Sequence, residues 1–284
     1  MNTAILALHR VRVPLFAISI VAIFGGTLLG LLLPGGRLAW AADRLPPAGL
    51  AGMVAGYLLA FFGARLLGPP PEPVVVTAPV AGRWLGMNSP VDKVPSHGVR
   101  VYGQAHAIDL VHEPLDAPRP AFGDGPAMRR SADYPAFGQP VRSMVAGTVV
   151  RSSDSQRDHR ARSNKWAVAY LMAEGALREL GGPRFVTGNH ITIQTAQGRY
   201  ALLAHLKQGS ALVRRGDTVE AGQVVAACGN TGNSSEPHVH AQLMDGPSTW
   251  TAQGLPMAFA NVSIGHDPVP RDGLPGNGEH LTAS

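Results

Sequence analysis

Residues Cys228–Leu243 read C-G-N-T-G-N-S-S-E-P-H-V-H-A-Q-L and say more about the fold than any other stretch. A turn rich in glycine and serine leads into a run that predicts a short strand. His238 and His240 are two residues apart, so on a strand they lie on one face, roughly 6–7 Å apart at the backbone. Two imidazoles at that distance suit one zinc ligand and one catalytic neighbour. The alternative is a pair of surface histidines on an edge strand.

Composition narrows the classes of protein and of site. The chain has 284 residues, enough for one domain with additions, and a formal net charge of +5. Its basic residues are scattered in short clusters, which is not typical of a nucleic-acid-binding surface. Cys228 is the one cysteine, so the chain forms no internal disulfide and no multi-cysteine zinc site. Any metal would be held by His, Asp or Glu.

The amino-terminal residues 1–72 are apolar and predict a membrane anchor followed by a proline-rich spacer. Residues 13–34 form an almost uninterrupted apolar run, long enough to span a bilayer as a helix. Residues 46–67 predict a second transmembrane helix, whose glycines and alanines suit close packing against the first. A cleaved signal peptide is the alternative for the first segment, since Ala39-Trp40-Ala41 resembles a cleavage site. The long apolar core favours a retained anchor.

The positive charges do not decide the orientation of this anchor. Arg10 and Arg12 precede the first span, and Arg37 and Arg44 lie between the two, so the counts nearly balance. Two retained spans would place both ends of the chain on one side of the membrane. The sequence G-P-P-P-E-P at 68–73 predicts a stiff, extended spacer that holds the following domain off the membrane.

Residues 73–262 predict a mostly β domain of the antiparallel sandwich type. The run 140–150 indicates two strands around a tight turn, and 190–205 indicates a hairpin. Residues 151–188 form an insertion, within which 166–180 have the pattern of an amphipathic helix. We expect this helix to pack on the domain, with a cleft cover or membrane docking as alternatives. The polar residues 263–284, rich in glycine and proline, predict a flexible tail.

The phrase V-R-R-G-D-T-V-E-A-G-Q-V-V at 213–225 also suggests another class of protein. Biotin- and lipoyl-carrier domains use such a phrase and present a modified lysine at an exposed hairpin tip. Within residues 190–250 the single lysine is Lys207, which directly follows a strand end. The phrase therefore indicates shared β-sandwich architecture and not carrier function.

The candidate metal ligands come from two distant parts of the chain. A catalytic zinc usually takes three protein ligands and leaves one position for water. Asp109, in the apolar run A-H-A-I-D-L-V, is a carboxylate that needs a partner, and with His240 it supplies two ligands. The third is either His97 or His106. His106 is three residues before Asp109 and would face away on a regular strand, so we favour His97, although a β-bulge would rescue His106.

In this order of motifs the chain resembles the lysostaphin/LytM-type zinc metallopeptidases, which cleave peptide bonds in bacterial peptidoglycan. The resemblance covers roughly residues 96–245 and is most specific at G-N-T-G-N-S-S-E-P-H-V-H. It implies the LytM-like sandwich of duplicated-hybrid type and a Zn²⁺ cofactor. It assigns metal binding to Asp109 and His240 and catalysis to His205 and His238, and His97 completes the metal site.

Two departures from the family pattern stand out. Ala105 occupies the position four residues before the aspartate, where the family's commonest pattern has its first ligand. The insertion is also longer than usual. A domain of this type that has lost a ligand would serve instead as a non-catalytic binding or regulatory module in cell-wall remodelling, which is the alternative function.

The resemblance also implies a mechanism and a location. Zinc would lower the pKa of its bound water, and the two catalytic histidines would orient or deprotonate that water and stabilise the oxyanion. The sequence has no H-E-x-x-H motif, so the glutamate-base mechanism of common zincins does not apply. Expected partners are peptidoglycan peptides, the membrane, and cell-division or wall-synthesis proteins, with no nucleic acid. The location implied is the bacterial inner membrane, with the catalytic domain extracytoplasmic (periplasmic).

Overall fold

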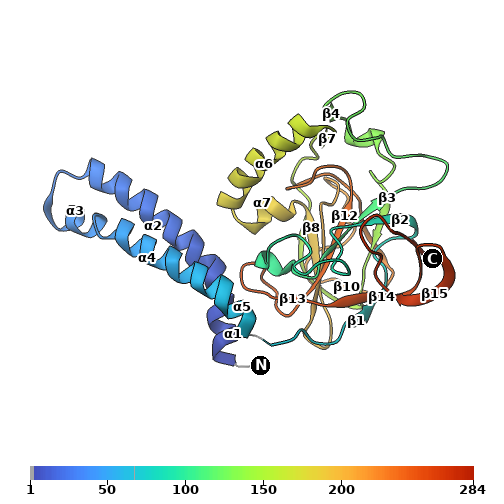
Figure 1. Cartoon of the computed structure of the whole chain (residues 1–284), viewed down its shortest axis with the longest axis horizontal. Helices are drawn as coiled ribbons and strands as arrows, with labels where there is room; N and C mark the ends of the chain where they lie inside the picture. Colours follow the sequence, from blue (N-terminus) through green and yellow to red (C-terminus); the bar gives the residue numbers. More distant parts are fainter. Residues whose placement is uncertain (1–2, 67) are drawn as a thin grey trace. The chain divides into compact units, whose positions relative to one another are not determined.

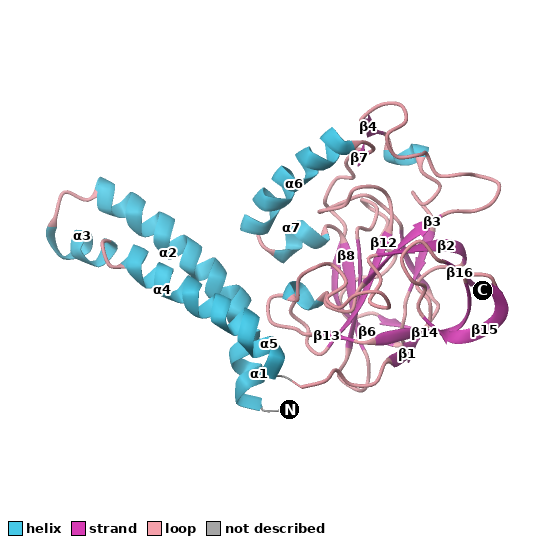
Figure 2. Ribbon diagram, in the orientation of Figure 1, coloured by secondary structure: helices cyan, strands magenta, loops and turns pink. Residues whose placement is uncertain are grey.

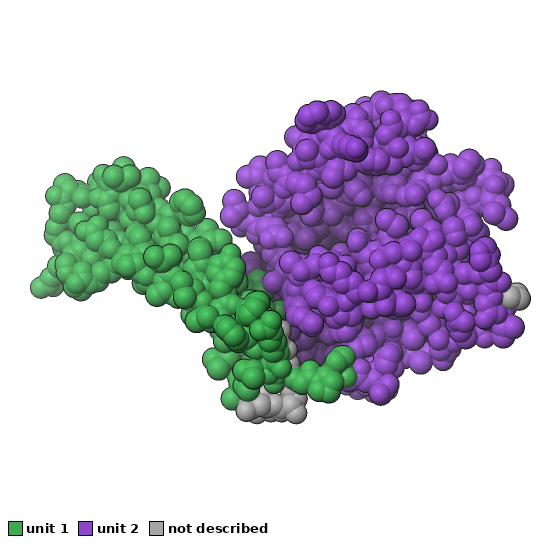
Figure 3. All heavy atoms as spheres, in the orientation of Figure 1, with its two compact units in different colours: residues 1–70 green, residues 71–284 purple. Residues whose placement is uncertain are grey.

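The structure is a computed structural model that describes residues 3–66 and 68–284. The chain divides into two compact units, residues 1–70 and residues 71–284, drawn in different colours in Figure 3. Each unit has its own internal contacts, and each is described separately below.

The N-terminal unit is a helical hairpin (Figure 1). Its longest elements are α2 (Arg12–Leu32) and α4 (Leu45–Leu58). The two helices pack closely because glycines on α4 face α2. A Cβ added to Gly49 would lie only 2.6 Å from the carbonyl oxygen of Ser19. Phe16 and Tyr57 meet edge to face across the same contact, with ring centroids 5.0 Å apart. The helices run α1 (Thr3–Arg10), α2 (Arg12–Leu32), α3 (Gly36–Ala42), α4 (Leu45–Leu58), η1 (Leu59–Gly63) and α5 (Ala64–Leu66).

Two helical stretches in this unit could cross a membrane, judged by length and composition alone. They are Arg12–Leu32, with mean hydropathy 2.4, and Gly36–Gly63, with mean hydropathy 1.6. The expected spans 13–34 and 46–67 fall mainly within these stretches, and residue 67 lies outside the described residues. The second stretch begins earlier than expected because α3 already forms after Gly36.

The C-terminal unit is mostly sheet, as predicted (Figure 2). A large sheet has the strand order β1-β14-β16-β2-β3-β12-β9-β8-β6-β10, with β13 added beside β12 and β15 beside β14, and two smaller pairs are β5–β11 and β4–β7. The strands are β1 (Val74–Val76), β2 (Gly82–Met87), β3 (Ile108–His112), β4 (Met128–Arg129), β5 (Pro140–Arg142), β6 (Gly147–Ser153), β7 (Ala161–Arg162), β8 (His190–Gln194), β9 (Tyr200–Ala204), β10 (Thr218–Val219), β11 (Val224–Ala227), β12 (Val239–Met244), β13 (Gly254–Leu255), β14 (Met257–Ile264), β15 (Asp267–Gly273) and β16 (His280–Ala283).

The pairing of these strands confirms most local predictions. Strands β5 and β6 flank the expected turn, and β8 and β9 form the expected antiparallel hairpin. One pair departs from the antiparallel prediction, because β1 pairs with β14 in parallel. The long connection between these two strands allows the parallel pairing, which a hairpin turn could not provide.

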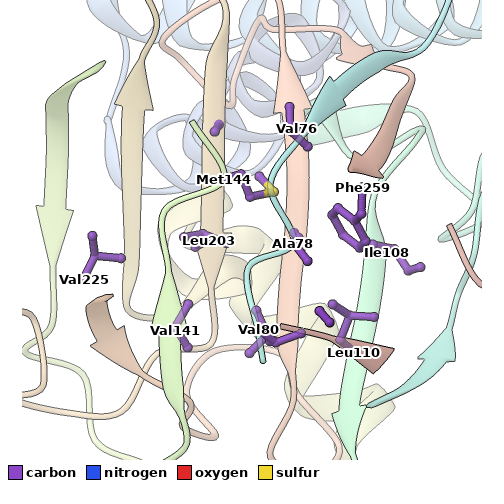
Figure 4. Packing of buried hydrophobic residues seen from close by; sticks show 14 of the residues in the cluster. Val76, Ala78, Val80, Ile108, Leu110, Val141, Met144, Leu203, Val225 and Phe259 are labelled. Carbon is purple, nitrogen blue, oxygen red and sulfur yellow. The ribbon is translucent and has the colours of Figure 1, made fainter. Parts of the chain in front are cut away.

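The hydrophobic core joins the large sheet to the β5–β11 pair (Figure 4). Val141 and Val225 come from the small pair and are completely buried. Ile108 and Leu110 on β3 reach the same cluster from the large sheet. Asp109 lies between them in sequence and therefore points to the opposite face of the sheet. The core thus fixes β3 and leaves the carboxylate on the face where the site forms.

The predicted flexible tail at 263–284 is wrong. Strand β16 pairs with both β2 and β14, and β15 pairs with β14. Leu281 is completely buried in the core, and His280 Nε2 lies 2.6 Å from Glu113 Oε2. Some of the glycines and prolines that suggested disorder lie in turns between short strands and others within β15 itself, so composition misled the prediction.

The predicted helix in the insertion is confirmed as α6 (Lys165–Leu180), followed by α7 (Pro183–Thr187). Its N-terminus is capped by Asn164, whose Oδ1 accepts from the amide of Ala167 at 2.9 Å. The face that packs on the domain is formed by the small or apolar residues Ala167, Leu171 and Gly175. The more strongly apolar face predicted from the sequence is exposed, and its residues are described below.

Cys228 should be inert in the folded protein. Its side chain is completely buried, and burial raises the pKa of its thiol above the ordinary value. Since the thiolate is the reactive species, a maleimide should label the native chain very slowly and the urea-unfolded chain rapidly. Comparing the two by mass spectrometry tests this, and equally fast labelling of the native chain would contradict the burial.

Candidate metal centre

The site begins with the pairing of β3 and β12. These strands run antiparallel with Asp109 directly opposite His240. Side chains opposite one another in such a pair lie close together on the same face. Asp109 Oδ1 and His240 Nδ1 are 2.8 Å apart, and both residues are buried. The H-x-H motif and the aspartate, 131 residues apart in sequence, therefore meet through sheet register alone.

His97 reaches the same point from the loop that precedes β3. The amide of Ser96 donates to the carbonyl of Ala105 at 3.0 Å, which closes this loop. His97 Nε2 then lies 3.1 Å from Asp109 Oδ2. Ligand atoms of His97, Asp109 and His240 all lie within 4.8 Å of one another. These are the three residues to which the sequence analysis assigned the metal.

Among the residues that the structure describes, His106 does not join the candidate metal group of His97, Asp109 and His240. Its side chain is mostly buried, and burial, followed by the charge of Arg100, lowers its pKa. The geometry favours His97 as the third ligand. The loop before β3 turns at Tyr102 and Gly103, both of which have left-handed backbone conformations. His190, another buried histidine, does not belong to the candidate metal group among the described residues. Burial lowers its pKa to about 4, and its Nδ1 faces the carbonyl of Gly188 at 2.8 Å.

His205 and His238 stand beside the three candidate ligands. Their rings are 4.7 Å apart between centroids, and His205 is 5.7 Å from the ring of His240. His238 Nε2 lies 3.6 Å from Asp109 Oδ1. His205 directly follows β9 with φ +59°, and its amide donates to the carbonyl of Thr187. This left-handed turn directs the chain away from the sheet at the residue that borders the site.

Hydrogen bonds determine which nitrogen of these two rings carries the proton. His205 Nδ1 is 2.8 Å from the carbonyl oxygen of Thr231, and His238 Nδ1 is 2.8 Å from that of Glu236. A carbonyl oxygen only accepts, so each Nδ1 must donate. In the neutral rings, Nε2 then carries the lone pair. Both histidines are therefore set as proton acceptors at the nitrogen that lies away from these carbonyls.

The same reasoning applies to His240. Gln242 Nε2 donates to the carbonyl of Tyr102 at 3.0 Å, which orients the amide so that its Oε1 faces His240 Nε2 at 2.8 Å. His240 Nε2 must therefore be the donor. Its Nδ1 then presents a lone pair to Asp109 Oδ1.

His97 is held in a corresponding way. The hydroxyl of Ser96 donates to the carbonyl of Gln104 at 3.2 Å and so accepts from His97 Nδ1 at 3.0 Å. His97 Nε2 then presents a lone pair to Asp109 Oδ2. Two imidazole lone pairs and a carboxylate face one another at hydrogen-bond distance, and such an arrangement is stable only with a proton or a metal cation among the atoms. Two histidines and one carboxylate are a donor set that Zn²⁺ takes in catalytic sites.

The electrostatics agree with this donor set. Burial alone would raise the pKa of Asp109, but the neighbouring imidazoles of His97, His238 and His240 hold that pKa well below its ordinary value. Burial, then the neighbouring His238 and His240, lowers the pKa of His205 well below its usual range. At neutral pH the site therefore holds an ionised carboxylate next to a neutral His205.

Sequence reasoning missed two residues that orient the ligands. Asn88 Nδ2 donates to Asp109 Oδ2 at 2.7 Å, from a left-handed backbone position directly after β2. Gln242 is the orienting partner of His240 described above. Gln242 could have been found, because H-A-Q places it two residues after His240 on the same strand face. No local pattern marks Asn88.

Comparison with known proteins shows which family the C-terminal unit resembles. Residues 128–251 match the model of peptidase family M23, a segment that includes His205, His238 and His240 and follows His97 and Asp109. Among solved structures, the chain is similar to the catalytic domain of the antimicrobial peptidase lysostaphin from Staphylococcus simulans (22% identity, 54% of this chain and 78% of that chain covered, TM-score 0.31).

Two further solved structures are similar at comparable levels. One is the catalytic domain of the prophage-encoded M23 protein EnpA from Enterococcus faecalis (19% identity, 66% and 92% covered, TM-score 0.32). The other is a zinc-containing peptidase from Vibrio cholerae (20% identity, 64% and 37% covered, TM-score 0.29). The resemblance to this family predicted from the sequence is confirmed by the match of residues 128–251 to the model of peptidase family M23.

Proposed function

We propose that the protein is a zinc metalloendopeptidase that hydrolyses peptide bonds of bacterial peptidoglycan. The observation that carries the proposal is the convergence of His97, Asp109 and His240, whose ligand atoms lie within 4.8 Å of one another with the histidine lone pairs turned toward the carboxylate. Two further buried histidines, His205 and His238, lie beside this group and supply the side chains that catalysis would need in addition to a metal.

The residues divide into two roles under this proposal. His97 Nε2, Asp109 and His240 Nδ1 would hold the ion, and a bound Zn²⁺ would act as a Lewis acid and activate a water molecule. His238 and His205 would accept a proton at Nε2 from the attacking water, because their Nδ1 protons are committed to carbonyls. Once protonated, either ring would stabilise the developing oxyanion.

The location proposed for this activity is the outer face of the bacterial inner membrane. Support comes from the family match, whose solved relatives include lysostaphin, and from the two apolar helical stretches in residues 12–63. Retained as spans, these stretches would anchor the domain next to its substrate. Cell-division and wall-synthesis proteins are the partners that such a location would bring together with it.

The test of the function separates metal binding from hydrolysis. The full chain, purified in detergent, is assayed for zinc content by mass spectrometry and for release of soluble peptides from purified peptidoglycan. We expect one zinc per chain and measurable hydrolysis, with His238→Ala retaining zinc and losing hydrolysis. A chain that binds zinc without any hydrolysis would support the alternative, a non-catalytic regulatory module. A chain without zinc would overturn the proposal.

Gln242 should determine the strength of metal binding without touching the metal. Replacing Gln242 with leucine keeps the size of the side chain and removes the acceptor that fixes His240 Nε2–H. Changes to such an orienting partner typically weaken metal binding by about 10–100-fold. Competition with a chelator measures the zinc affinity, and Gln242→Glu, which keeps an acceptor, is the matched control. Equal affinity in the leucine variant and the native chain would show that His240 needs no orienting partner.

A further inference from the structure

Helix α6 carries an exposed apolar stripe along its whole length. Its residues recur at the spacing of one helix face: Trp166, Tyr170, Ala173, Leu177 and Leu180. Trp166 is 84% exposed, and Leu177 and Leu180 are 69% and 68% exposed. The stripe is opposite the face formed by Ala167, Leu171 and Gly175, which packs on the domain. A helix with apolar residues on both faces needs a second apolar environment.

The helix is held firmly to the domain, so the stripe is a fixed surface. Glu174 pairs with Arg162 and lies 3.6 Å from Arg178, and Arg178 donates to the carbonyl of Gly232. Gly175 lies against the side chain of Asn233, where an added Cβ would be 3.1 Å from its Oδ1. These contacts use the inner face of α6. The side chains of the stripe remain exposed, and Figure 1 shows the backbone of α6 at the edge of the unit.

The composition of the stripe and its flanks fits a lipid surface. Tryptophan and tyrosine are enriched where protein meets the boundary between lipid and water. The exposed basic residue Lys165 begins α6, and α7, which follows α6, carries the exposed basic residue Arg184 and the exposed ring of Phe185. Glu179 is the exposed acidic residue on the helix. An amphipathic helix of this kind lies in the plane of the membrane interface with its apolar face inward.

The connection to the N-terminal unit keeps a membrane within reach. Residues 67–73 join α5 to β1 and span at most about 25 Å even when fully extended. A domain of this size has a radius of gyration of about 17 Å, so its surface cannot move far from a bilayer that holds α2 and α4. Tethering of this kind raises the effective concentration of the surface at the membrane, and a weak contact suffices.

We infer that the stripe on α6 docks on the lipid bilayer in which the N-terminal helices are anchored. The inference rests on the anchoring proposed above and is independent of the peptidase chemistry. Docking would fix the rotation of the domain relative to the membrane. Because α6 contacts the 229–237 turn, docking would also hold that turn at a constant orientation to the membrane.

The experiment places an environment-sensitive fluorophore at three positions of the full chain. Leu177→Cys tests the stripe, and Leu212→Cys, at a residue 70% exposed in a loop, is the matched control. Tyr57→Cys on α4 reports insertion of the anchor. The buried Cys228 does not take up the label. Each labelled chain is reconstituted into vesicles of phosphatidylethanolamine and phosphatidylglycerol, with a quencher either on the lipid chains or dissolved in the water as iodide.

We expect the lipid-borne quencher to reduce the fluorescence of the labels at 57 and 177 several-fold more than that of the label at 212. Quenching at 57 with 177 matching 212 would overturn the docking and keep the anchor. A label at 177 shielded from iodide yet not quenched by lipid would indicate a protein surface and would also overturn it. Absence of lipid quenching at 57 would overturn both anchor and docking. Zinc content and hydrolysis, measured on the same chains, report on the peptidase proposal separately.

Discussion

Replacing His240 with alanine should remove zinc from the protein and abolish peptide hydrolysis. His240 contributes the ligand on β12 that lies directly opposite Asp109, at 2.8 Å. Loss of an orienting partner alone weakens metal binding by about 10–100-fold, so loss of a ligand should weaken it further. Zinc content by mass spectrometry and affinity by chelator competition give the direct readout. Full hydrolysis by the variant would contradict the proposed metal centre.

A pair of variants then tests which histidine completes the centre. His97→Ala should lose zinc as His240→Ala does, because His97 Nε2 is the nitrogen that faces Asp109 Oδ2 at 3.1 Å. His106→Ala is the matched control, since it also removes a histidine from the loop before Asp109. The His106→Ala variant should keep its zinc, even if loss of this buried side chain lowers the free energy of unfolding. Zinc loss in the His106 variant alone would reverse the assignment.

Replacing Leu281 with alanine should destabilise the domain strongly although the residue is three positions from the end of the chain. Leu281 is completely buried on β16, between β14 and β2. Deleting a buried leucine side chain to alanine typically costs about 2–5 kcal/mol. The free energy of unfolding, measured by pulse proteolysis of the full chain in urea, should fall by that amount.

The control for this prediction is Val269→Ala. Val269 lies on β15 and is 65% exposed, so its truncation should change the free energy of unfolding by less than about 0.5 kcal/mol. A flexible tail would make the two variants indistinguishable. A large difference between them would establish that the C-terminal strands are part of the folded unit.

The sequence predicted the part of the site that depends on strand geometry. The i, i+2 spacing placed His238 and His240 on one face, and the motif order brought Asp109 and His205 to them. The position of His97 depends on a loop with left-handed residues at Tyr102 and Gly103, and side-chain periodicity does not describe such a path. The sequence favours His97 because the spacing of His106 is unsuitable on a regular strand and because a turn near Tyr102 would let His97 return to Asp109.

In two places the structure departs from sequence-based expectations that were inferred, in one case, from amino-acid composition and, in the other, from the amphipathic pattern of a helix. Glycine and proline in residues 263–284 suggested disorder, yet alternate residues of β16, Leu281 and Ala283, are buried and complete the sheet. In α6 the helix was predicted correctly, but its most apolar face is exposed, because small residues on the other face allow close packing against the 229–237 turn. Hydrophobicity alone does not say which of two apolar faces will meet the core.

The parallel pairing of β1 with β14 has a mechanical consequence. β1 is the first strand after the spacer, and Val74, Val75 and Val76 are paired with Met257, Ala258 and Phe259. A pulling force along the spacer would enter the domain at this short strand. In the sheet order β14, β16 and β2 stand between β1 and β3. Pulling on the spacer would therefore act first on the edge strand β1, and three strands separate β1 from β3, which carries Asp109.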